Sequence, residues 1–325
     1  MSFIRTMLGD ISPENLGFTY SHEHIVCKPA YWVERGSDDL ILDDPEKSKQ
    51  DVLIFKALGG RSIIDATAVD YGREPAAVRK ISEETGIQIV GTAGFNKSFL
   101  WDAKMPGQDT TYRHWIEHST IDSLASFVVG EVEKGMNGTD IKAGQVKFGT
   151  GYNSINPLEI KTIRAVARAH LTTGAPIHSH TESGSMPLEQ MVYLKEEGIS
   201  LENVSFGHLD RNPDPYLHLK IAETGAYLCF DGIGKIKYGP ESQRISCILS
   251  LFKHGYGDQV LVSGDTARRT YYYSYGYYGL GLGYIIGTWV PRFKDEAYRD
   301  GIDGEDAVRR IFIENPRKCF SFKKR

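Results

Sequence analysis

The chain has 325 residues, of which 41% are hydrophobic and 25% are charged, a composition typical of a folded globular protein. The formal net charge of -4 argues against the basic surface that attracts nucleic acids and anionic membranes, so neither is expected as a partner. No apolar run approaches the roughly 18 residues of a membrane span and no secretory leader pattern is present, so we expect a cytoplasmic protein. The scattered cysteines predict reduced, structural thiols: Cys27, Cys229, Cys247 and Cys319.

Short β-rich segments recur along the chain, and most of them end at a polar or glycine-rich break. Eight such strands are predicted, at residues 18–24, 62–68, 87–95, 143–151, 175–182, 204–210, 226–232 and 259–266. Segments between them carry apolar residues three and four positions apart and a closing glycine, which is typical of helices. These predicted helices cover residues 45–60, 74–86, 121–135, 156–174 and 185–198.

Alternating strands and helices over this length predict an α/β fold, a single (β/α)8 TIM barrel that forms one domain over residues 1–325. A doubly wound open sheet is the competing architecture, but no GxGxxG motif follows the first strand. Elaborated loops are expected after strand three (95–120), strand seven (231–240) and strand eight (266–293). Loops at the carboxyl ends of barrel strands shape the substrate pocket.

An HxH pair, His22 and His24, ends the first predicted strand, and alternate strand residues point to the same side. Alone, the pair could equally consist of core histidines that are satisfied by hydrogen bonds. Later strand ends carry the same chemistry, however. Because the carboxyl ends of barrel strands meet at one rim, these side chains predict a metal site; they are His178, His180, His208 and Asp265.

Lys147 lies at the end of the fourth predicted strand, and the sequence AGQVKFGTG supplies no anionic side chain to that part of the rim. A lone lysine at such a place is more often a contact to a substrate phosphate or part of a structural ion pair. Its amine could instead react with carbon dioxide and form a carbamate that bridges two metal ions. Chemistry alone does not favour the carbamate.

The motifs SHEH, HSHTE and GHLDRNPD, together with the lysine of strand four and the aspartate of strand eight, closely resemble the phosphotriesterase-like branch of the amidohydrolase superfamily. The likeness covers nearly the whole chain. It implies two divalent metal ions, with zinc expected and manganese or cobalt possible, and a homodimer. His178 matches no ligand position in the family, so we interpret it as a residue behind the ligands or in the core.

Carried over residue by residue, the resemblance implies that His22, His24 and Asp265 hold one metal ion and that His180 and His208 hold the other. Carbamylated Lys147 would bridge both ions. The resemblance also implies a hydrolytic mechanism, in which a hydroxide shared by the metals attacks the carbonyl carbon of an ester or lactone. Asp265 would take the proton and return it to the leaving alkoxide.

Cations in the loops after strands seven and eight favour an anionic substrate, although solvated loop charges are an equally plausible interpretation of any one of them. The segments DTARRTY and GKIKY resemble those of the family's phosphorylated-sugar lactonases. This likeness implies phosphate contacts from Arg268, Tyr271 and one of two lysines, Lys235 or Lys237, with Lys97 as a further candidate.

We therefore expect a metal-dependent hydrolase that opens the lactone ring of a phosphorylated sugar, such as a pentono lactone. An acyl-homoserine lactonase with promiscuous phosphotriesterase activity is the alternative within the hydrolases, and a tunnel lined by aliphatic groups would favour it. A barrel that binds a ligand without catalysis is the alternative outside them. The segment after strand seven lacks the histidine that the family's organophosphate hydrolases place in a proton relay, which makes efficient phosphotriester hydrolysis doubtful.

Overall fold

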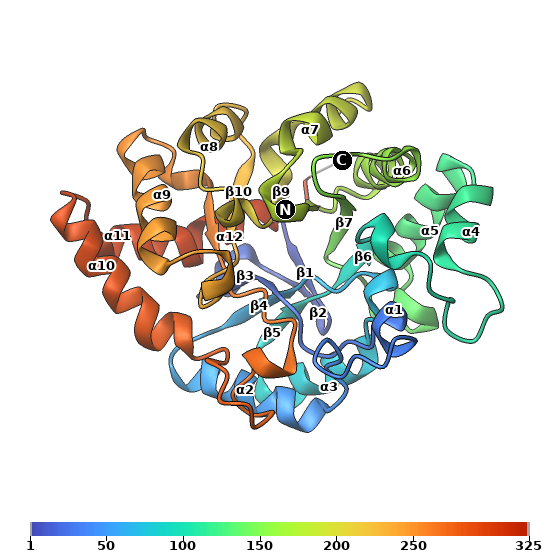
Figure 1. The fold of residues 1–325 in the computed structure, drawn as a ribbon, viewed down its shortest axis with the longest axis horizontal. Coiled ribbons are helices and arrows are strands. Elements are labelled where there is room, and N and C mark those ends of the chain that lie inside the picture. Colours follow the sequence, from blue (N-terminus) through green and yellow to red (C-terminus); the bar gives the residue numbers. More distant parts are fainter. Residues whose placement is uncertain (1, 324–325) are drawn as a thin grey trace.

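In the computed structural model, which describes residues 2–323, parallel strands form the centre of the molecule and helices surround them (Figure 1). The central strands are β3 (Thr19–Glu23), β4 (Ser62–Asp65), β5 (Gln88–Val90), β6 (Thr92–Gly94), β7 (Gln145–Thr150), β8 (Ile177–Thr181), β9 (Val204–Phe206), β10 (Tyr227–Phe230) and β11 (Val260–Val262). Each predicted strand coincides with one of these, except that the third is divided between β5 and β6.

The ring of strands closes. β5 pairs with β4 and β6 pairs with β7, so the divided third strand joins the two parts of the sheet. The last strand, β11, lies against the first, β3, and the backbone N–H of Asp265 donates to the carbonyl of His22 at 3.0 Å. With β5 and β6 counted as one divided strand, eight parallel strands follow one another around a closed ring, which confirms the predicted barrel.

The predicted helices agree with the structure to within three residues at each end. The helices are α1 (Ala30–Val33), α2 (Pro45–Ala57), α3 (Pro75–Thr85), α4 (Tyr112–His118), α5 (Ile121–Glu133), α6 (Pro157–Thr173), α7 (Pro187–Glu196), α8 (Pro215–Ala222), α9 (Glu241–Lys253), α10 (Val290–Arg299), α11 (Gly304–Arg309) and α12 (Asn315–Cys319). Within residues 2–323, no helix is both long and apolar enough to cross a bilayer. All four cysteines are buried and unpaired, as predicted.

The segments that follow the strands carry short elements of their own. Residues 95–120 include a 3-10 turn, Ser98–Leu100, as well as α4, and the segment after β10 forms the turn Ile236–Tyr238. After β11 the chain makes the turn Arg269–Tyr271 and later a π-helical turn, Ile285–Trp289. A small antiparallel hairpin, β1 (Ile4–Thr6) with β2 (Gly9–Ile11), precedes the barrel. The C-terminal segment contacts the residue just before this hairpin, since the N–H of Phe322 donates to the carbonyl of Phe3 at 2.9 Å.

The helix α6 shows how the sequence fixes one of these units. Asn156 accepts hydrogen bonds from the backbone N–H groups of Leu158 and Glu159, and the Glu159 carboxylate accepts the backbone N–H of Asn156 in return. The helix ends at Thr173, and the next residue, Gly174, has a φ of +76° that suits glycine. Its inner face packs against α5 and β7, and burying a side chain such as Ile163 contributes about 1.5–3 kcal/mol.

Replacing Asn156 by alanine should lower the free energy of unfolding by about 1 kcal/mol, because the first turn of α6 then loses its side-chain acceptor. Urea denaturation followed by circular dichroism measures the change. Thr172→Ala, at an exposed position of the same helix, is the control and should stay within about 0.5 kcal/mol of the wild type. Equal stability of both variants would show that the capping box does not limit the barrel's stability.

Candidate metal centre and active site

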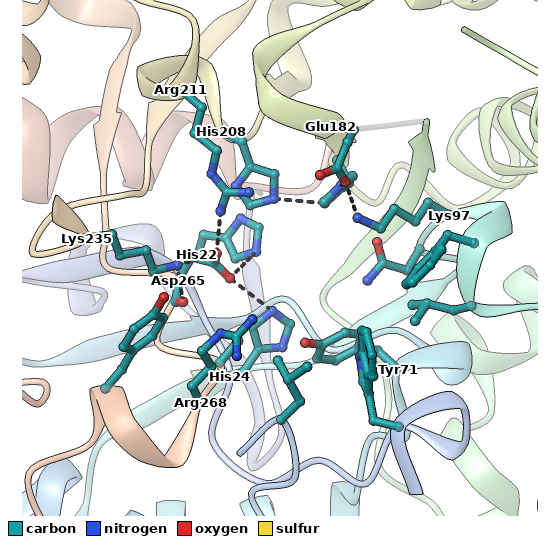
Figure 2. A pocket seen from close by; sticks show the side chains of 18 of the residues that line it. His22, His24, Tyr71, Lys97, Glu182, His208, Arg211, Lys235, Asp265 and Arg268 are labelled. Carbon is teal, nitrogen blue, oxygen red and sulfur yellow. Dashed lines mark hydrogen bonds and ion pairs between the residues drawn. The ribbon is translucent and has the colours of Figure 1, made fainter. Parts of the chain in front are cut away.

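Three side chains from the first and last strands converge where these strands end. His22 lies in β3, His24 follows that strand directly, and Asp265 follows β11. Asp265 Oδ1 lies 3.7 Å from His22 Nε2 and 3.4 Å from His24 Nε2, and both rings point toward the carboxylate in Figure 2. Ligands at about 2.1 Å from a tetrahedral zinc ion lie about 3.4 Å from one another. The spacing therefore fits one divalent ion.

The donor set has a further property that fits a metal. His22 Nε2 is buried and has no hydrogen-bond partner among the described residues. Leaving a buried polar nitrogen without a partner costs about 1–3 kcal/mol. A metal ion at the point shared by His22, His24 and Asp265 would supply that partner.

A second pair of imidazole nitrogens meets beside this group. His180 Nδ1 in β8 lies 2.8 Å from Nε2 of His208, the second residue after β9. Lys147 in β7 lines the same cavity, is only 1% exposed, and donates from Nζ to the carbonyl of Ala66 at 2.8 Å. Burial lowers the pKa of Lys147 to about 8, which raises the share of neutral amine, the form that reacts with carbon dioxide.

In each of the four imidazoles, those of His22, His24, His180 and His208, the second ring nitrogen contacts a polar side chain. Such partners fix the orientation of a ligating imidazole and its tautomer. The contacts are His24 Nδ1 with Thr67 Oγ1 at 2.8 Å, His22 Nδ1 with Asp231 Oδ2 at 3.0 Å, His208 Nδ1 with Asp231 Oδ1 at 2.6 Å, and His180 Nε2 with Glu182 Oε2 at 3.0 Å. Burial also lowers the pKa of His24 to about 4 and that of His208 to about 3, so both rings are neutral at pH 7, as metal ligands must be.

His178 occupies a different position from the four proposed ligands His22, His24, His180 and His208. Its Nε2 lies 2.9 Å from His22 Nδ1, and its Nδ1 lies 2.8 Å from Ser205 Oγ. It is buried and does not line the cavity. The structure therefore places His178 behind His22, on the side away from Asp265.

A cavity of about 210 Å³ opens in front of these groups. Five of its lining side chains are cationic and only two are carboxylates: Lys97, Lys147, Arg211, Lys235 and Arg268 against Glu182 and Asp265. Large apolar side chains line another part of it: Trp32, Leu40, Phe99 and Leu100. The excess of cations over carboxylates suits an anionic ligand.

The structure brings four of the five predicted substrate contacts to this cavity: Lys97, Lys235, Arg268 and Tyr271. Lys235 is 5% exposed and donates to Asp265 Oδ2 at 2.5 Å, whereas Arg268 pairs with Asp39 Oδ2 at 2.8 Å. Lys97 forms an ion pair with Glu182. Lys237 is exposed, lies over the ring of Tyr238 and does not line the cavity, because the turn Ile236–Tyr238 directs it outward.

Three further residues of the site escaped sequence reasoning. Arg211 donates to Asp265 Oδ2 at 2.7 Å and lies over the ring of Tyr238, Glu182 joins His180 to Lys97, and Asp231 joins His22 to His208. Each follows the carboxyl end of a strand within a few residues, as the predicted ligands do. Their position just after a strand was the sequence signal that could have identified these three residues.

A closed parallel barrel whose strand ends carry two groups of buried His and Asp side chains has the architecture of a metal-dependent barrel enzyme. The model of the Phosphotriesterase family matches residues 2–320, and the chain belongs to this family, which confirms the predicted resemblance. The family and the relatives described next, two of which are lactonases, identify the chain as an ester-hydrolysing enzyme.

Similar proteins agree with this assignment. A phospho-furanose lactonase from Mycoplasmopsis agalactiae is 32% identical, with 98% of this chain and 92% of the relative covered. A crystal structure of a lactonase from Listeria monocytogenes is 64% identical with a TM-score of 0.97, covering 99% of this chain and 100% of the other. The structure of the phosphotriesterase homology protein from Escherichia coli is 31% identical with a TM-score of 0.85, covering 94% and 99%.

Asp231→Asn should weaken metal retention about 10- to 100-fold, because an amide can accept from one of the two imidazoles but not from both. Elemental analysis after dialysis against a graded series of chelator concentrations measures it. Asp70→Asn removes a buried carboxylate that accepts from Asn96 and Trp101 but from no imidazole, and it should retain metal like the wild type. Equal metal loss from both variants would contradict a specific role for Asp231.

Proposed function

We propose that this protein opens the lactone ring of a phosphorylated sugar and that it uses two divalent metal ions to do so. One observation carries the proposal. The His and Asp side chains that fit a metal ion and a set of cationic side chains line the same small cavity. The names of the relatives support it, since one is a phospho-furanose lactonase and another is a lactonase.

The residues that would hold the metals are those that converge at the strand ends. His22, His24 and Asp265 would bind one ion, His180 and His208 would bind the other, and carbamylated Lys147 would bridge the two. When bound, two such ions lower the pKa of a shared water and polarise the carbonyl of the substrate. Zinc is the expected metal, and manganese or cobalt suits the same ligands.

Asp265 is the residue that we expect to move a proton. Its Oδ1 faces the imidazoles, while Lys235 and Arg211 donate to Oδ2 and hold the carboxylate in one orientation. From there Asp265 would take a proton from the attacking water and return it to the leaving oxygen of the ring. A lactone suits this arrangement because its leaving group stays attached after the ring opens.

Arg268, Lys235 and Tyr271 are the proposed contacts of the phosphate, and Lys97 is a further candidate. Arg268 lies near Tyr271, with its guanidinium 5.9 Å from the ring, and Lys235 Nζ lies 5.2 Å from the same ring. The Escherichia coli relative was solved with phosphate in its active site, which supports an anion subsite in this family. Arginine and lysine bind phosphate oxygens through charge-assisted hydrogen bonds.

The acyl-homoserine lactonase alternative finds less support. A long alkyl chain needs an apolar tunnel, whereas this cavity measures about 210 Å³ and has four cationic side chains besides Lys147 in its wall. A binding protein without catalysis would be expected to lack a ligand of the metal site, and none of the family's ligand positions is missing here.

Arg268→Ala should lower kcat/KM for a phosphorylated lactone by about 10- to 150-fold, because a bidentate charged contact contributes about 1.5–3 kcal/mol. The rate on an unphosphorylated lactone should change little, since Asp265 and the metal ligands are untouched. A pH-indicator assay on both substrates gives the comparison.

Arg269→Ala is the matched control, because the neighbouring arginine pairs with Asp43 and does not line the cavity. Its kcat/KM should stay near the wild-type value on both substrates. If Arg268→Ala slows both substrates equally, Arg268 serves the fold or the metal site, and if it slows neither, the phosphate lies elsewhere.

Lys147→Ala should abolish turnover and lose metal, and millimolar acetate or propionate should restore part of the rate by entering the space that the side chain leaves. Elemental analysis should give two metal equivalents for the wild type and fewer for the variant. Retention of both metals and of the full rate without added acid would refute the bridging role.

A further inference from the structure

Glu23 is a fully buried carboxylate that the proposed mechanism does not use. It lies in β3 between His22 and His24. Because successive side chains of a strand point to opposite faces, the two imidazoles and this carboxylate leave the strand on opposite sides. The imidazoles face the cavity, and Glu23 faces the last strand of the barrel.

The Glu23 carboxylate binds the backbone on both sides of Asp265. Its Oε1 accepts the N–H of Gly264 at 2.7 Å and the hydroxyl of Ser263 at 2.8 Å, and its Oε2 accepts the N–H of Thr266 at 2.7 Å. These three bonds are short and charge-assisted, which makes them stronger than bonds between neutral groups. Glu23 therefore ties the end of β11 to β3.

The backbone that Glu23 holds is strained. Asp265 has a φ of +43°, in the left-handed region that side chains with a Cβ atom seldom adopt. Such conformations are unfavourable and persist only where neighbouring groups enforce them. A Cβ atom on Gly264 would lie 3.0 Å from Glu23 Oε1, so glycine at this position lets the carboxylate approach.

We propose that Glu23 is a positioning residue for Asp265, and this inference rests on the proposed role of Asp265 as a metal ligand. By fixing the N–H groups before and after Asp265, Glu23 holds its carboxylate opposite His22 and His24. One tripeptide, His22–Glu23–His24, thus presents two ligands and orients the third.

The test compares Glu23→Ala, Glu23→Gln and a matched control. Glutamine keeps an acceptor oxygen for Ser263 and Gly264, but its amide nitrogen cannot accept from Thr266. Asp51→Asn is the control, because Asp51 is equally buried and its carboxylate accepts the backbone N–H groups of Tyr273, Ser274 and Leu282, away from Asp265. The full-length, zinc-loaded proteins are titrated with a chelator, and Tm is measured in parallel.

Glu23→Ala should release its first zinc equivalent at a chelator activity about 10- to 100-fold lower than the wild type, with Glu23→Gln between the two. Asp51→Asn should lower Tm and keep the wild-type release curve. The inference is overturned if the Glu23 variants keep that curve, or if Asp51→Asn releases zinc as readily as they do, since the effect would then be general destabilisation.

Glu23→Gln, the more conservative variant, carries the test if Glu23→Ala does not fold. The outcome is separable from that of the proposed function. A wild-type protein that binds zinc but opens no lactone refutes the substrate proposal and leaves the Glu23 comparison intact. A wild-type protein that binds no zinc overturns both.

Discussion

The structure depends on one constraint, which is that ionisable side chains converge in a space that excludes most water. Burying a charged or polar group without a partner is costly. Desolvation lowers the pKa values of His24 and His208, so these imidazoles stay neutral, whereas Lys235 outweighs the effect of burial and holds the pKa of Asp265 well below its usual range. The site is thus a set of neutral nitrogens around an ionised carboxylate, the arrangement that a divalent cation prefers.

The partners behind the ligands follow from the same constraint. Asp231 accepts from His22 and His208, which come from opposite parts of the chain, and so couples the two candidate metal positions. One oxygen of Asp265 accepts hydrogen bonds from Lys235 and Arg211, and the other oxygen faces the imidazoles. Because these contacts cross between strands far apart in sequence, the site is complete only in the closed barrel.

Strand-end chemistry could be read from the sequence because a parallel barrel brings every carboxyl end to one rim. His22, His24, His180, His208 and Asp265 meet as their strand positions required. His178 shows the limit of that reasoning, since it shares the strand and the spacing of His180 yet lies behind His22. Periodicity puts alternate residues on one side of a strand, but it does not say how deep in the barrel each one lies.

The sequence by itself determined the order of strands and helices, the barrel and the rim at which the His and Asp side chains of the strand ends meet, because these follow from periodic patterns and from the direction of parallel strands. The roles of these side chains as metal ligands were implied by the resemblance to the family. Only the tertiary structure decided which loop residues enter the cavity. Lys235 and Lys237 are two positions apart, yet one is buried against Asp265 and the other is exposed, because Gly234, with its φ of +85°, and the turn Ile236–Tyr238 set their directions. Arg211, Glu182 and Glu23 likewise depend on partners that only the closed barrel brings within reach.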